Sequence, residues 1–181
     1  WAVALLSLLG LAATLFLPSV APWLNRLDHW TSDWRTAYLS YASPTPHPRI
    51  AVVSITDTTL KDYASSPIDR GLLARIVNAL DTAGAQAIGI DIFYLKRTEP
   101  DKDAAYIAAL KGSSAKIVLG AVDERGGLEA FQTAFQRDFL AVTGRPAGYL
   151  NLRHERDDVV RYTASPAPAS AFPKSFARLL A

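Results

Sequence analysis

Two aspartates and one arginine are the residues of this chain best placed for chemistry. Asp57 closes the apolar run IAVVSITD, and Asp91 lies within a second apolar run, AIGIDIF. Arg70 closes the Pro-Ile-Asp-Arg turn between the two runs, and the spacing is that of one strand–helix–strand unit. Because ligands of open α/β sheets lie at the carboxyl ends of strands, we expect both aspartates at a functional edge of a sheet.

Three roles are open to these two carboxylates. Asp57 and Asp91 could hold a divalent cation, because hard cations prefer carboxylate oxygens, or they could act as an acid–base pair. They could equally accept hydrogen bonds from backbone N–H groups and fix the neighbouring loops. A strand-end carboxylate without a defined nucleophile is weak support for an enzyme, so a structural or ligand-orienting role is favoured.

Arg70 is expected to have an acidic partner. It lies at the start of a predicted helix, where the helix dipole disfavours a cation unless an anion compensates it. Asp57 and Asp91 are the partners we expect. Two interpretations stay open, an internal ion pair and a binding site for an anionic ligand.

A second polar group lies near the C-terminus, in the segment AGYLNLRHERDDVVRYTAS. This segment predicts an antiparallel hairpin that contains Asn151, Asp157 and Arg161. An arginine at such a position can bind an anionic ligand through two parallel hydrogen bonds. The alternative is that Arg161 is a solvated strand charge that faces Asp157 or Asp158.

Motifs for other chemistry are missing from the sequence. There is no cysteine, the three histidines are scattered without zinc-site spacing, and neither a G-x-S-x-G elbow nor a glycine-rich phosphate loop occurs. We therefore expect no catalytic residue, no metal and no cofactor. The net charge of +2 gives no indication of a nucleic-acid partner.

The hydrophobic periodicity predicts an α/β fold. Its central sheet is expected to be mostly parallel, with helices on both faces and the C-terminal antiparallel hairpin beside it. The predicted strands cover residues 50–56, 86–93 and 115–122, and the predicted helices cover residues 71–84, 99–113 and 128–142. Asp69 is expected to cap the first of these helices.

The N-terminal part of the chain is of a different kind. The first 25 residues carry no charged side chain, and residues 1–24 predict the outer part of a transmembrane helix flanked by Trp1 and Trp23. A buried helix of a soluble protein and a cleaved signal peptide are the alternatives. Residues 25–43 predict a long amphipathic membrane-proximal helix, and residues 44–49 a proline-rich linker before the α/β domain of residues 50–181.

The chain resembles the CHASE domain of the second type. The order and spacing of several short motifs carry the resemblance: residues 33–35 (DWR), 50–57, 67–70 (PIDR), 84–93 and 151–161. Three positions depart from the family pattern. Thr58 follows Asp57 where a second acidic residue is common, Arg70 lacks a preceding aromatic residue, and Val159 stands where the family's terminal turn has glycine.

The resemblance implies an extracytoplasmic sensor of a bacterial receptor. Its signal would be an unknown small molecule or protein, passed through membrane helices to a cytoplasmic output such as a nucleotide cyclase or histidine kinase. We expect an inner-membrane homodimer with residues from about 25 onward in the periplasm or extracellular space, and no enzyme activity in this segment, although the full-length protein could carry a cyclase or kinase domain. The alternative is a membrane-anchored metal-dependent hydrolase that uses Asp57 and Asp91.

Overall fold

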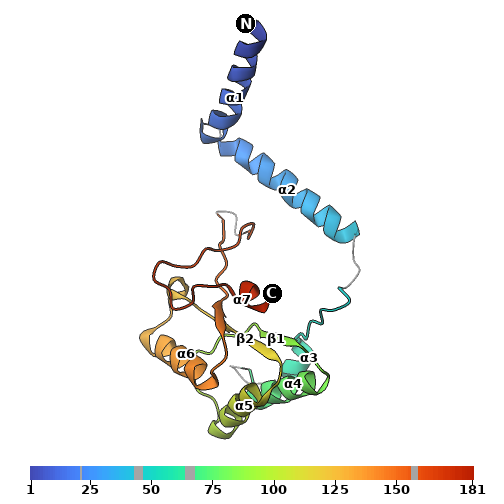
Figure 1. Ribbon diagram of the computed structural model, residues 1–181, viewed down its shortest axis with the longest axis vertical. Coiled ribbons are helices and arrows are strands. Elements are labelled where there is room, and N and C mark those ends of the chain that lie inside the picture. The colour runs from blue at the N-terminus through green and yellow to red at the C-terminus, as the bar shows by residue number, and fades with distance from the viewer. Residues whose placement is uncertain (21, 43–46, 64–67, 156–158) are drawn as a thin grey trace. The chain divides into compact units, whose positions relative to one another are not determined.

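The computed structural model of the protein describes residues 1–20, 22–42, 47–63, 68–155 and 159–181. The chain divides into two compact units, Trp1–Ser54 and Ile55–Ala181. Figure 1 shows both units.

The first unit consists of two helices, α1 (Ala2–Val20) and α2 (Pro22–Ala42). Proline suits the first turn of α2, because its missing N–H would have no partner there. Leucines on all sides of α1 are exposed, and on α2 the ring of Trp34 stacks on that of Tyr38 with their centres 6.2 Å apart. Over the described residues, no helix combines the length and the hydropathy needed to cross a membrane.

The second unit is built on a parallel sheet. Its strands are β1 (Ala87–Ile90), β2 (Lys116–Ala121) and β3 (Ala147–Tyr149), in the order β1-β2-β3. Crossover helices α5 (Pro100–Gly112) and α6 (Ala130–Thr143) join consecutive strands, as parallel pairing requires. The predicted α/β class and parallel sheet are therefore confirmed.

Local sequence signals start and stop these helices. Asp69 caps α4 (Arg70–Thr82) as predicted, because its Oδ1 accepts a hydrogen bond of 2.7 Å from the N–H of Leu72. Pro100 occupies the first turn of α5. Gly144 ends α6 with a positive φ of 66°, a conformation that glycine adopts without strain.

Helices α4, α5 and α6 cover one face of the sheet and enclose the core. The buried side chains that meet there are aliphatic on the strands and partly aromatic on the helices; they include Leu73, Val77, Ile88, Ile90, Tyr94, Tyr106, Leu110, Ile117, Leu119 and Phe139. Aspartate and arginine side chains also tie the elements at the amino end of the sheet. Asp81 accepts hydrogen bonds from residues 113–115, and Arg145 donates to the last carbonyls of α5.

The short helix α7 (Phe176–Leu180) covers the opposite face and contacts all three strands (Figure 1). Glycines make room for it. A Cβ at Gly89 would lie 2.7 Å from a methyl group of Leu180, and a Cβ at Gly148 would lie 2.5 Å from the backbone nitrogen of Phe176. The backbone of α7 thus rests directly on the backbone of β3.

Two sequence predictions about strands are wrong. Residues 50–56 form no strand, and the side chains of Val52 and Val53 are exposed. The boundary between the two units falls within this segment, and no described strand pairs with it. Residues 147–149 pair in parallel with β2 rather than within a hairpin. The described part of the expected hairpin has one antiparallel bridge, between Arg153 and Tyr162, and residues 156–158 lie outside the described residues.

The contact between β3 and α7 predicts a clear difference between two glycine-to-alanine substitutions. Gly148→Ala should destabilise the protein by about 1–3 kcal/mol, because the new methyl group meets backbone atoms that cannot turn away. Gly112→Ala is the control: it lies at the end of α5 with open space around it and should be neutral or slightly stabilising. Urea unfolding of both variants measures this, and equal stabilities would contradict the described seating of α7.

Candidate functional site

The two aspartates that the sequence singles out do not form a pair. Asp57 is the exposed first residue of helix α3 (Asp57–Asp62) rather than the end of a strand. Asp91 does follow β1 directly, as predicted, and its side chain is exposed. Among the described residues, no group of three histidine, cysteine, aspartate or glutamate side chains could hold a metal ion.

Arg70 is buried, and its partner is not the predicted one. Its side chain is 1% exposed, and its Nε lies 3.6 Å from Oδ1 of Asp103 on α5, so the expected pairing with Asp57 or Asp91 is wrong. The reason is geometric: α4 packs along α5, which brings the first turns of the two helices together. The guanidinium carbon also lies 4.8 Å from the ring centre of Tyr94 and 5.2 Å from that of Phe139.

Arg70 is held more by aromatic faces than by hydrogen bonds. Within the described residues, its Nε and Nη2 have no hydrogen-bond partner, and both oxygens of Asp103 accept hydrogen bonds from Thr98. Burial raises the pKa of Tyr94 to about 12, so this ring is neutral and its face is available to the cation. The surroundings of Arg70 indicate a core cation rather than an open anion site.

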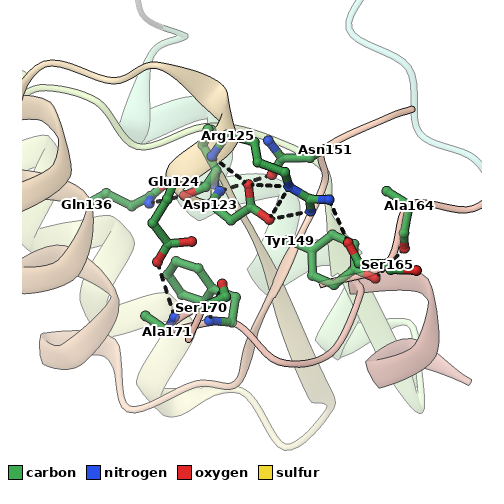
Figure 2. Close-up of polar contacts among 12 residues, drawn as sticks. Asp123, Glu124, Arg125, Gln136, Tyr149, Asn151, Ala164, Ser165, Ser170 and Ala171 are labelled. Carbon is green, nitrogen blue, oxygen red and sulfur yellow. Dashed lines mark hydrogen bonds and ion pairs between the residues drawn. The ribbon is translucent and has the colours of Figure 1, made fainter. Parts of the chain in front are cut away.

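A polar cluster at the carboxyl end of β2 and β3 is the better candidate site (Figure 2). We call Asp123, Arg125, Tyr149 and Asn151 the strand-end cluster. The carboxylate of Asp123 is fully buried and accepts hydrogen bonds of 3.1 and 2.9 Å from Nε of Arg125. The backbone N–H of Asp123 donates to Oδ1 of Asn151 at 2.9 Å, which links the ends of the two strands.

Helix α6 fixes the end of β2 from the core side. The amide of Gln136, which is buried, accepts a hydrogen bond from the N–H of Val122 and donates one to its carbonyl, both at 2.9 Å. Two bonds from one side chain hold this residue as a neighbouring strand would. Asp123, the next residue, therefore enters the cluster from a fixed backbone.

The buried Asp123 carboxylate remains charged. Burial raises its pKa, but the hydrogen bonds from the side chain and backbone of Arg125 outweigh that effect and hold the pKa below its usual value. The same interaction raises the pKa of Arg125. Arg125 also lies over the ring of Tyr149, with its guanidinium carbon 5.5 Å from the ring centre.

The strand-end cluster also holds the segment that leads to α7. We call residues 163–175 the strap. Nη1 of Arg125 donates to the carbonyl of Ser165 at 2.6 Å, and the Tyr149 hydroxyl donates to the carbonyl of Ala164 at 2.6 Å. Figure 2 shows both bonds reaching the strap from the strand ends.

An open cavity of about 410 Å³ lies beside the cluster. Its walls come from the 3₁₀ turn η1 (Glu124–Gly126), the segment after β3 and the strap; the lining residues are Arg125, Asn151, Leu152, Arg153, His154, Ala164 and Ser165. Asn151 and Arg125 thus belong both to the cluster and to the cavity wall. A binding molecule could reach the cluster from this side.

The remaining predicted residues have different outcomes. Asn151 belongs to the strand-end cluster, where its Oδ1 accepts the hydrogen bond from the N–H of Asp123. Arg161 pairs with Glu155 at 2.6 Å, and residues 157 and 158, which it was expected to face, lie outside the described residues. Sequence reasoning missed Asp123. This residue directly follows the apolar run AKIVLGAV, much as Asp57 closes its apolar run and Asp91 lies within its own, so the same pattern could have identified it.

The environment of Arg70 predicts losses of stability of different size for two substitutions. Arg70→Ala should destabilise the protein by about 3 kcal/mol or more, because it leaves a cavity in the core and an unpaired Asp103. Arg70→Met should cost much less, because methionine fills the space between the rings without a charge to bury. Thermal and urea unfolding report both, and an equal loss in the two variants would show that the charge itself stabilises the fold.

The lowered pKa of Asp123 predicts a pH-dependent difference in stability. Because the folded pKa lies below the usual 3.8, the carboxylate contributes stability above pH 3.8, and this is lost as pH falls through the folded pKa. Asp123→Asn should therefore be destabilised at neutral pH, with a difference from wild type that narrows in acid. The exposed Asp138→Asn is the control and should match wild type at every pH. A difference for Asp123→Asn that stays constant down to acid pH would contradict the assignment.

Comparison with known proteins identifies a domain family that covers both units of the chain. The family model for the CHASE2 domain matches residues 3–181, which is nearly the whole chain. No curated protein and no solved structure matches the sequence. The family match spans the parallel sheet, the strand-end cluster and the N-terminal helices, and the chain belongs to the CHASE2 domain family, a family of sensory domains of receptors.

Proposed function

We propose that this chain is the extracytoplasmic sensory segment of a bacterial membrane receptor, which takes its signal at the strand-end cluster. The carrying observation is that Arg125 connects an open cavity with the strap that precedes α7. Family membership supports the sensory role. The output is a cytoplasmic domain such as a nucleotide cyclase or histidine kinase.

The contacts of the strap support a route for the signal. A ligand changes a conformational equilibrium only through its different affinity for the two states. A molecule in the cavity touches Arg125 and Ser165, whose mutual hydrogen bond holds the strap, so its binding energy depends on where the strap lies. Any movement of the strap then acts on α7, which follows it directly in the chain.

The first unit supports a membrane location and a dimer. The uncharged stretch of residues 1–25 suits contact with lipid, and the exposed leucines of α1 have no apolar cover in their own unit. On α2, exposed apolar and aromatic side chains recur at spacings of three and four, at Leu27, Trp30, Trp34, Tyr38 and Tyr41. This spacing is typical of paired parallel helices, and we infer a homodimer in which α2 contacts its counterpart.

The structure does not support the alternative function, a metal-dependent hydrolase that uses Asp57 and Asp91. It required both carboxylates at adjacent strand ends, and Asp57 lies on α3 instead. Its side chain is exposed, so it lacks the burial expected of a catalytic acid or base.

Cysteine labelling in cells tests the location on which the sensory role depends. The chain has no cysteine, so Ala108→Cys, at an exposed position on α5, gives one reactive thiol in this segment. A membrane-impermeant maleimide should label this variant in intact spheroplasts, with the parent protein as the control. Labelling that requires lysis would place the domain in the cytoplasm and overturn the proposed function.

A further inference from the structure

The cavity beside the strand-end cluster is rich in donors and lacks acidic side chains along its described wall. Three of its seven lining residues are arginine or histidine, namely Arg125, Arg153 and His154. The nearest acid in the cluster, Asp123, is buried and pairs with Arg125 through two of its nitrogens. That pair is neutral as a unit, so it does not repel an anion.

Arg153 supplies the uncompensated charge. Its guanidinium carbon lies 5.9 Å from the ring centre of Tyr162, and in the described part of the chain no carboxylate pairs with it. The ring contact orients the guanidinium without using its N–H donors. Arginine in such a position binds a carboxylate through two parallel hydrogen bonds.

The neutral lining residues extend this donor set. Oδ1 of Asn151 is occupied by the N–H of Asp123, so the amide NH₂ is the group that remains for a ligand. The carbonyl of Ser165 is occupied by Arg125, so its hydroxyl remains. Leu152 and Ala164 give the same cavity apolar wall area.

From these groups we propose that the cavity binds a small organic monocarboxylate that carries an apolar group. The buried Asp123 cancels the charge of Arg125, so Arg153 leaves one positive charge at the wall, which matches one carboxylate. The volume of about 410 Å³ lies within the usual range for small-molecule sites. This inference rests on the proposed function, because it names the chemical class of the signal that the strand-end cluster receives.

Titration of the full chain in detergent with benzoate tests the chemical class. Benzoate should bind saturably at up to millimolar concentrations by calorimetry, whereas benzamide, which has the same shape without the charge, should not bind. Inorganic phosphate is the third probe. Phosphate binding as tight as benzoate, or benzamide binding as tight as benzoate, would overturn the assignment to a carboxylate.

Two variants test the site. Arg153→Gln should weaken benzoate binding about ten- to a hundredfold, the loss expected for a charge-assisted hydrogen bond, and leave the unfolding midpoint unchanged. Arg137→Gln is the matched control, because this exposed arginine on α6 pairs with Asp138 and does not line the cavity. Unchanged affinity in Arg153→Gln would overturn the site. Absence of benzoate binding together with external labelling of Ala108→Cys would refute this inference and leave the proposed function standing.

Discussion

The arrangement of the second unit around its strand-end cluster depends on keeping the buried carboxylate of Asp123 charged. Removing Asp123 from water costs several kcal/mol, and that cost is offset only if strong donors meet its oxygens. Arg125 provides them, and this fixes the arginine in one orientation, which in turn fixes the strap through Ser165 and one wall of the cavity. One electrostatic requirement at the end of β2 therefore determines the geometry of the whole candidate site.

The charges of two arginines in this protein, Arg125 and Arg70, are compensated in different ways. Arg125 satisfies its charge through several short hydrogen bonds and stays in contact with solvent. Arg70 is buried and satisfies its charge through three aromatic rings and one long ion pair. The first arrangement can change when a ligand competes for its donors, whereas the second holds α4, α5 and α6 together.

Sequence reasoning succeeded where local pattern decides the structure and failed where distant neighbours decide it. The cap Asp69 and the apolar runs that form β1 and β2 depend on local sequence pattern, and the prediction of each is confirmed. The run at residues 50–56 is similarly apolar but lacks a described strand beside it, and an apolar sequence cannot supply that strand. The partner of Arg70 comes from the packing of two helices. The strand-end logic applied to Asp57 and Asp91 would have found Asp123 had it been extended to the next apolar run.

The glycine at position 148 has a mechanical consequence. Because the main chain of Phe176 rests on the main chain of β3, no side-chain rotamer lies between them to absorb a displacement. This contact between two backbones is therefore stiffer than a contact made through side chains, which can change rotamer. A shift of β3 is therefore passed to α7 with little loss of amplitude, and the position of one short helix reports the state of the sheet beneath it.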